Sequence, residues 1–186
     1  DYYEAGLNGS ANLGYGLLLA AQGIVRDAGA TDDGDVRLDY ALLDYGYALA
    51  STATVGIRAG RVKNAFGFYN DARDVIFTRP GILLPMMYSD AQGIRSLLFS
   101  SDGAEVYARA FYGSHELSLS GSYATDRDLN RVEKRQFATN RAFDHTDTRV
   151  DELRFARLQD EWAGGRFKLA FSYVGGDLEV DDPRGA

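Results

Sequence analysis

Apolar residues alternate with small or polar residues along much of this chain, and this pattern limits the fold more than any other sequence feature. The alternating segments are residues 12–25, 54–62, 116–124 and 166–174. In the last of these, Phe167, Leu169 and Phe171 alternate with Lys168 and Ala170. Successive side chains of a strand point to opposite faces, so this period of two predicts strands with one apolar and one polar face. We therefore expect an all-β protein.

The connections between the expected strands alternate between short and long. The short connections are residues 8–10, 51–52, 113–115 and 163–165, and the long ones are residues 26–35, 63–103, 125–150 and 175–186. Outer-membrane barrels have tight turns at one end and long loops at the other, and their tilted strands need about 9–11 residues to cross. The sequence therefore predicts an antiparallel transmembrane β-barrel, or an incomplete part of one, formed by residues 1–186 as a single domain.

Composition excludes several classes of protein. The chain is 45% hydrophobic and 25% charged, which argues against intrinsic disorder. It has no apolar run near the ~18 residues of a membrane-spanning helix. The absence of cysteine excludes disulfides, thiolate nucleophiles and cysteine-ligated metals. A net charge of −7 disfavours nucleic acid as a partner, because that binding depends on neutralising phosphates.

The sequence does not support catalysis. Its two histidines are His115, in an expected short turn, and His145, in a polar segment. No Gly-x-Ser-x-Gly, His-Glu-x-x-His, phosphate-binding or dinucleotide-binding motif is present. The acidic run at residues 32–35 lacks the spaced ligands of an EF-hand loop and predicts a surface turn. We therefore predict a protein that is not an enzyme and has no catalytic residues, metal or cofactor.

The segment of residues 61–103 is too apolar to lie exposed in water and is also rich in charge. Its large apolar side chains include Phe66, Phe68, Phe77 and Met86, and they would otherwise form an exposed patch. Both properties fit a segment that packs its apolar side chains against the barrel wall and turns its charges to water. The sequence thus predicts that residues 64–102 form a long loop inserted into the lumen.

The same segment carries a family resemblance. Its motifs are Gly-Arg-Val-Lys at 60–63, Phe-Gly-Phe-Tyr-Asn-Asp at 66–71, Arg-Asp at 73–74, Phe-Thr-Arg-Pro at 77–80, Leu-Pro at 84–85 and Ser-Asp-Gly at 101–103. Together they resemble a stretch of the porins of Gram-negative outer membranes. The resemblance is specific over about a quarter of the chain, whereas the flanking strands match only in pattern.

The resemblance implies a homotrimeric barrel of many strands in a Gram-negative outer membrane, in contact with lipid and lipopolysaccharide. It also implies passive diffusion of ions and small hydrophilic solutes past an inserted loop, without a cofactor. The sequence departs from the family in two places. Residues 1–7 resemble the end of a strand, and residues 181–186 resemble a loop without a terminal aromatic residue. We therefore expect at most eight strands and an internal fragment of a longer polypeptide.

Charged residues at a narrow place determine the selectivity of a pore. On the inner wall, the residues that we expect at this place are Arg58, Arg61, Lys63, Arg109 and Lys168. On the loop, they are Asp71, Arg73, Asp74 and Arg79. Opposed basic and acidic groups would set a transverse field across the lumen. The alternative is that each arginine pairs with an aspartate and only fixes the loop to the wall, and Arg73 and Arg79 fit this anchoring role better.

Two other functions remain open from the sequence. The first is a soluble or surface-anchored all-β binding module, in which the apolar faces would form an ordinary core. The second, with weaker support, is an outer-membrane β-barrel hydrolase that uses His145 with Asp144 or Asp147. The identity of the solute and the preference for cations or anions do not follow from the sequence.

Overall fold

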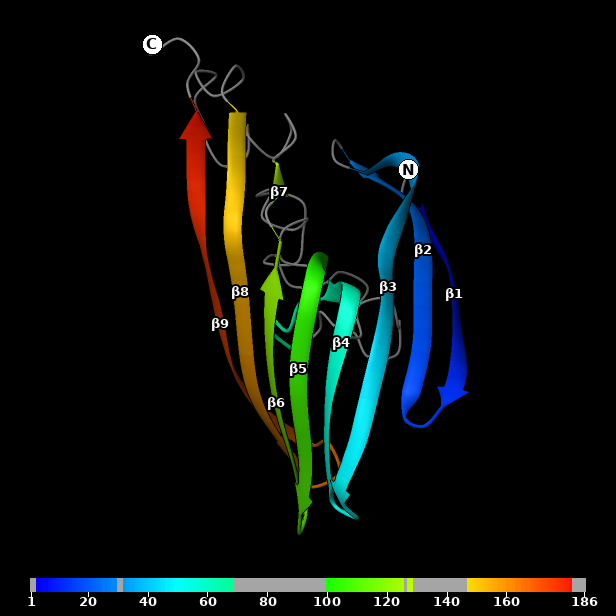
Figure 1. Cartoon of the computed structure of the whole chain (residues 1–186), viewed down its shortest axis with the longest axis vertical. Coiled ribbons are helices and arrows are strands. Elements are labelled where there is room, and N and C mark those ends of the chain that lie inside the picture. The colour runs from blue at the N-terminus through cyan, green and yellow to red at the C-terminus, as the bar shows by residue number, and fades with distance from the viewer. Residues whose placement is uncertain (1–2, 30–31, 69–99, 126, 129–146, 182–186) are drawn as a thin grey trace.

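The chain is all-β in the computed structural model, which describes residues 3–29, 32–68, 100–125, 127–128 and 147–181. The strands are β1 (Tyr3–Gly14), β2 (Leu17–Gly29), β3 (Asp32–Ala50), β4 (Ala53–Lys63), β5 (Ser100–Tyr112), β6 (His115–Ala124), β7 (Arg127–Asp128), β8 (Asp147–Trp162) and β9 (Phe167–Asp181) (Figure 1). The described residues include no helix that is long and apolar enough to span a membrane.

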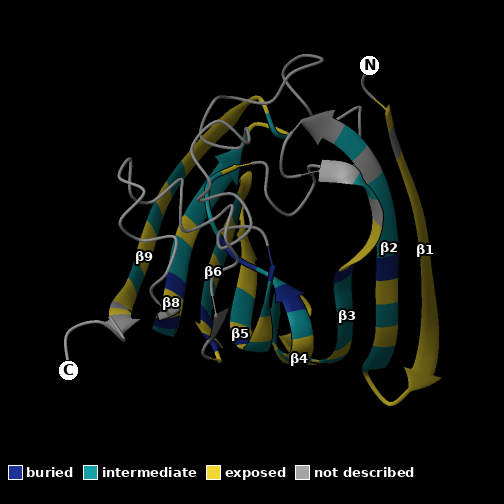
Figure 2. Ribbon diagram, turned by 90° about the horizontal axis from the view of Figure 1, so that it is seen from above, coloured by how far each residue is buried: buried dark blue, intermediate teal, exposed yellow. Residues whose placement is uncertain are grey.

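Eight long strands form one antiparallel sheet in the order β1-β2-β3-β4-β5-β6-β8-β9. The two-residue strand β7 pairs with β8 beyond the end of β6. The sheet curves into an arc with β1 and β9 at its two ends (Figure 2). Within the described residues, β1 pairs only with β2 and β9 only with β8, so the sheet stays open. The all-β antiparallel prediction is confirmed, but these strands do not close into a barrel.

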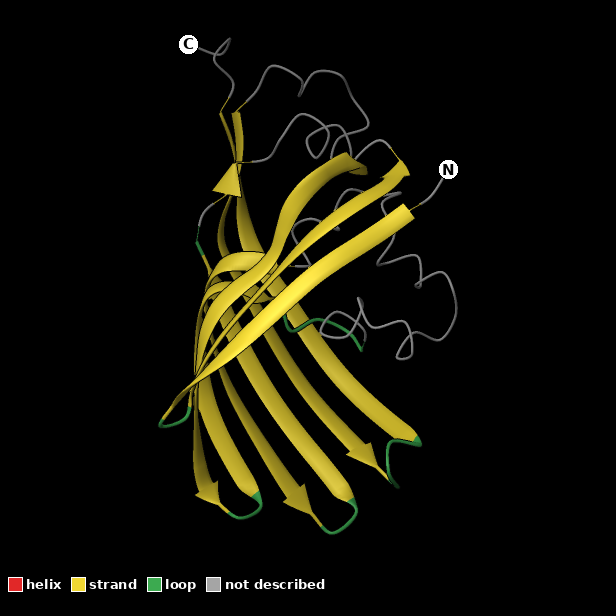
Figure 3. Ribbon diagram, turned by 90° about the vertical axis from the view of Figure 1, so that its right-hand side faces the viewer, coloured by secondary structure: helices red, strands yellow, loops and turns green. Residues whose placement is uncertain are grey.

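The tight turns lie together at one end of the sheet (Figure 3). They are formed by residues 15–16, 51–52, 113–114 and 163–166. The first turn contains Tyr15, with a φ of 52°, between Gly14 and Gly16, each with a φ of 83°. A side chain on Gly16 would overlap the carbonyl oxygen of Gly46, and the Gly46 N–H donates a hydrogen bond to the Gly16 carbonyl at 2.9 Å. Glycine at position 16 therefore allows both the turn and this close contact.

The position of the first turn corrects two predictions. The expected strand over residues 12–25 is wrong, because the turn at residues 15–16 divides it between β1 and β2. The expected turn at residues 8–10 is also wrong, because these residues lie inside β1. The register between β1 and β2 shifts between Asn12 and Gly14, and this shift restores the odd–even phase that a two-residue turn would reverse. Alternation therefore runs through the turn and does not reveal it.

The prediction of alternating short and long connections fails between β2 and β3. Residues 26–35 were expected to form a long connection, with an acidic turn at 32–35, but β2 extends to Gly29 and β3 begins at Asp32. Three other strands also extend into expected loops: β5 begins at Ser100, β8 at Asp147, and β9 ends at Asp181. Polar composition had suggested loops, yet these strands continue because backbone pairing does not need apolar side chains.

The two faces of the sheet differ in chemistry. Register partners share a face, and on one face three adjacent rows of partners run from β3 to β9. These rows are Asp44, Arg58, Glu105, Ser122, Phe155 and Val174; Gly46, Gly56, Tyr107, Ser120, Arg157 and Ser172; and Ala48, Thr54, Arg109, Ser118, Gln159 and Ala170. This polar face lies on the concave side, where residues 64–68 cross it from β4 to β8 and β9.

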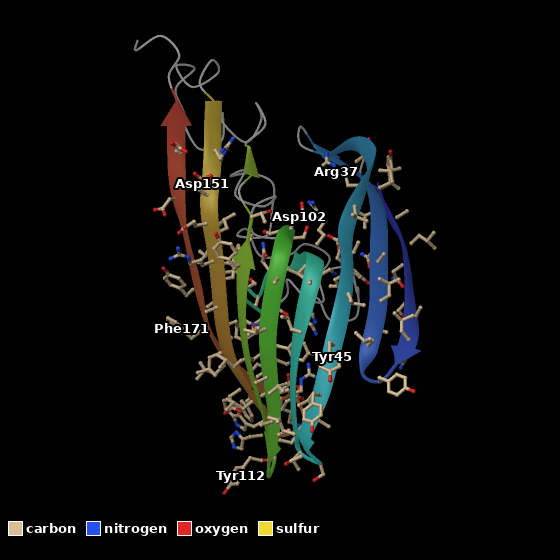
Figure 4. All side chains as sticks on the ribbon, in the orientation of Figure 1. Arg37, Tyr45, Asp102, Tyr112, Asp151 and Phe171 are labelled. Atoms are coloured by element: carbon tan, nitrogen blue, oxygen red, sulfur yellow. The ribbon has the colours of Figure 1, made fainter. Side chains whose placement is uncertain are left out.

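The opposite, convex face is apolar. Two of its rows are Tyr45, Ile57, Val106, Gly121, Ala156 and Tyr173; and Tyr47, Val55, Ala108, Leu119, Leu158 and Phe171. Figure 4 shows Phe171 projecting away from the sheet. Strand β6 shows the contrast directly, because Leu117, Leu119 and Tyr123 are exposed whereas Ser122 is buried. The polar face of the sheet is therefore less exposed than its apolar face.

Candidate functional site

Four side chains from three strands form a cluster on the concave face, which we call the Arg58 cluster: Asp44, Arg58, Glu105 and Tyr107. Arg58 on β4 is the register partner of Asp44 on β3 and of Glu105 on β5. Its Nε donates a hydrogen bond to Asp44 Oδ2 at 3.0 Å, and its Nη1 donates one to Glu105 Oε1 at 2.8 Å. One guanidinium thus joins two carboxylates across three strands, in charge-assisted bonds that are stronger than neutral ones.

Tyr107 completes the cluster from the next row. Its hydroxyl donates a hydrogen bond to Asp44 Oδ1 at 2.8 Å, and Arg58 Cζ lies 4.4 Å from the centre of its ring. The ring lies over Gly56, its register partner, because a side chain added at Gly56 would overlap it. The glycine therefore leaves the space that lets Tyr107 reach Asp44 and support Arg58 by a cation–π contact.

Exposure differs sharply within the cluster. The Glu105 side chain is 3% exposed, whereas the Arg58 side chain is 36% exposed. A buried carboxylate is costly unless it is paired, and the Arg58 guanidinium supplies that pairing. The cluster therefore stabilises the polar face. Part of its Arg58 cation stays exposed on the concave side.

Further ion pairs lie between this cluster and the tight turns. Arg109 Nε lies 3.1 Å from Glu116 Oε1, across β5 and β6. Lys168 Nζ lies 2.6 Å from Glu161 Oε2, across β8 and β9. Because each basic group lies beside an acidic one, this part of the face is polar and its charge is locally balanced.

Two other pairs lie toward the opposite ends of the strands. Lys63 Nζ is 3.3 Å from Asp39 Oδ2, and the Asp39 side chain is buried beside Gln22. Arg61 and Asp102 are register partners whose Nη1 and Oδ2 atoms lie 3.2 Å apart. These pairs join β3 to β4 and β4 to β5.

The chain leaves β4 and crosses the concave side at once. The Asn64 amide donates a hydrogen bond to Ser101 Oγ at 2.8 Å. The Gly67 N–H then donates to Ser172 Oγ on β9 at 3.0 Å, and Arg157 on β8 donates to the Gly67 carbonyl at 3.1 Å. Phe66 packs against the small apolar cluster of Ala124, Val150, Leu153 and Phe155. Residues 64–68 therefore link β4 to the far side of the arc.

All five residues expected on the inner wall lie in described strands: Arg58, Arg61, Lys63, Arg109 and Lys168. These residues do not form one group. Each is paired with a different carboxylate, and the ion pairs are spread along the sheet. Their expected partners on the loop, Asp71, Arg73, Asp74 and Arg79, lie outside the described residues, as does most of the expected inserted loop of residues 64–102.

Sequence reasoning missed the residues that pair with this set. The missed carboxylates are Asp39, Asp44, Asp102, Glu105, Glu116 and Glu161, and the missed positioning residues are Tyr107, Arg157 and Ser172. Arg58 and Arg109 were expected on the inner wall, but their partners Glu105 and Glu116 were not. The contacts depend on the register between strands, which alternation within a single strand does not specify.

Of the two histidines, only His115 lies in the described residues. His115 lies at the turn end of β6, where its Nδ1 is 3.0 Å from Asp160 Oδ2 and its ring stacks on Trp162. His145, on which the hydrolase alternative depends, lies outside the described residues. No group of histidine and acidic side chains in the described ranges could hold a metal ion.

Comparisons of the chain with protein-family models, with curated proteins and with solved structures found no match. The faces of the sheet and the contacts across its concave side are therefore the features that bear on function.

The packing of Tyr107 over Gly56 leads to a stability prediction. We expect Gly56→Ala to lower the free energy of unfolding by roughly 1–3 kcal/mol, the usual cost of overpacking, because the new methyl group would displace the Tyr107 ring. The measurement is equilibrium unfolding in detergent. Gly9→Ala is the matched control, because nothing lies within 4 Å of a side chain added there. Equal stability of the two variants would contradict this account of Tyr107.

Proposed function

We propose that this protein forms a passive diffusion channel for ions and small hydrophilic solutes in the outer membrane of a Gram-negative bacterium. The observation that carries this proposal is the inverted burial of the sheet. Among the described residues, the buried polar or charged set is as large as the buried hydrophobic set, with six members each. A sheet of a water-soluble protein would instead bury its apolar face against a core.

The convex face matches the chemistry of lipid. Its two central rows have no charged side chain from β3 to β9, and their exposed members include Ile57, Val106, Leu119 and Phe171. An apolar surface that crosses so many strands greatly exceeds the isolated patches usual on soluble proteins. In a bilayer this surface would contact hydrocarbon, and the described chain has no second sheet that covers it.

Aromatic side chains at the tight turns support the same orientation. Tyr15 is 99% exposed in the first turn, and Tyr112 lies at the turn end of β5 (Figure 4). The rings of Trp162 and Phe167 stack beside the last turn, with their centroids 5.5 Å apart. Aromatic residues with a polar group are enriched where a barrel meets the boundary between lipid and water. In this proposal the turn end lies at the periplasmic boundary.

The concave face would line the water-filled path. Its ion pairs, hydroxyls and amides resemble the polar interior of a porin barrel. A sheet in hydrocarbon cannot leave backbone groups unpaired, so the proposal requires further antiparallel strands beside β1 and β9. The porin-like motifs at residues 60–63, 66–71 and 101–103 extend the proposal to a homotrimer in contact with lipopolysaccharide.

Trp162 makes the membrane part of the proposal directly testable, because it is the only tryptophan in the chain. We expect lipids with brominated acyl chains to quench its fluorescence in vesicles, and Trp162→Phe to remove the signal. Planar bilayers should in addition show stepwise conductance. Solubility without detergent, with no quenching, would instead favour the soluble binding module. Quenching without conductance would retain the membrane location and reject the channel.

A further inference from the structure

The contacts of Gly67 point to residues that determine the width of the proposed path. The N–H of Gly67 donates to Ser172 on β9, and its carbonyl accepts from Arg157 on β8. Both polar groups of one residue are thus held by side chains of two neighbouring strands. Arg157 and Ser172 are register partners, so they occupy the same row of the concave face.

The hydrogen bonds of Gly67 to β8 and β9 hold a segment that begins at β4, in another part of the sheet. Residues 64–68 leave β4, and β5 and β6 lie between β4 and β8 in the strand order. The start of the segment is held by Asn64, which is 0% exposed and bonded to Ser101. Its middle is held by Phe66 against Phe155 and its neighbours. The segment is therefore attached on both sides of the polar wall.

Local backbone geometry suits this role. Gly67 has a φ of 64°, a left-handed conformation that glycine adopts without steric cost. This turn of the chain presents the N–H and the carbonyl of one residue to two different strands. A substitution that keeps the backbone but removes its two side-chain partners would leave both groups without these bonds.

We propose that Arg157 and Ser172 act as a clasp on Gly67 and so determine the largest solute that can pass the concave side. This inference rests on the proposed channel function, and it assigns the size limit to two positioning residues on β8 and β9. Without the clasp, residues 64–68 would lose both hydrogen bonds to β8 and β9, and the free cross-section beside these two strands would increase.

The test combines removal of the clasp with its covalent replacement. Neutral sugars of increasing size are used in vesicle swelling assays with the intact protein. We expect the double variant Arg157→Ala, Ser172→Ala to admit the larger sugars severalfold faster relative to the smallest one. Leu158→Ala, Phe171→Ala is the matched control, because it shortens two register partners of the same strands that lie on the opposite face from Gly67, and it should leave the size dependence unchanged.

Because the chain has no cysteine, the pair Gly67→Cys, Ser172→Cys tests the geometry separately. We expect it to form a disulfide under oxidising conditions, and we expect that bond to restore the normal size limit when Arg157 is also replaced by alanine. An unchanged size limit in the clasp variant, with the protein folded and conducting, would overturn the inference. A disulfide that forms without restoring the size limit would also overturn it. Absence of conductance in the unmodified protein would reject the channel while leaving the disulfide result interpretable.

Discussion

Leu158→Arg is expected to lower the free energy of unfolding in lipid by roughly 2–4 kcal/mol, the usual cost of an arginine on the lipid face near the bilayer midplane. Leu158 lies on the convex face between Leu119 and Phe171, in a row without charge. In the proposed membrane location, the guanidinium would enter hydrocarbon and lose its hydration. The measurement is denaturant unfolding in lipid vesicles, followed by Trp162 fluorescence.

Gln159→Arg is the matched control for this variant. Gln159 is the next residue of β8 and lies on the concave face between Ser118 and Ala170. The same side chain would there meet the polar wall, so we expect a change below about 1 kcal/mol, as for substitutions at hydrated surfaces. If the convex face were in water, Leu158→Arg would also be nearly neutral. That equality would contradict the membrane location.

Arg58→Ala is expected to cause the second large effect. It leaves the buried Glu105 carboxylate and the adjacent Asp44 carboxylate without their shared cation. Removal of one partner of a buried ion pair typically costs about 3–5 kcal/mol, and because Arg58 is partly exposed we expect about 2–3 kcal/mol. The measurement is equilibrium unfolding of the variant in detergent.

The control for Arg58→Ala is Arg109→Ala, two rows nearer to the tight turns. Arg109 and Glu116 are both substantially exposed, and exposed ion pairs contribute roughly 0–1 kcal/mol. The double variant Arg58→Ala, Glu105→Gln should recover part of the stability that Arg58→Ala loses, because the buried charge is then removed. No recovery would show that the loss has another cause than the unpaired carboxylate.

The all-β class could be predicted from alternation because the period of two is a local property of each strand. Strand β9 illustrates this, since Phe167, Leu169 and Phe171 follow one another on one face as expected. Residues 152–162 lie in strand β8, although their composition is equally compatible with a helix. The boundaries were less predictable, because the turn at residues 15–16, with the register shift beside it, preserves the phase and strands β2, β3 and β9 continue into polar sequence.

The candidate site was predictable only in part. The basic residue Arg58 was expected on the inner wall, but its partners Asp44 and Glu105 are 14 and 47 residues away along the chain. Likewise, Gly67 is 105 residues from Ser172. Such contacts depend on which strands are neighbours and on their register, and alternation is the same for every register that keeps the phase.

By itself, the sequence determined that the strands have an apolar and a polar face, because the side chains of a strand alternate whatever its neighbours are. Only the tertiary structure decided that the polar face is the concave one, that its charges pair across strands, and that residues 64–68 cross it. Those features arise from pairing and curvature of the whole sheet, which are properties of distant segments acting together.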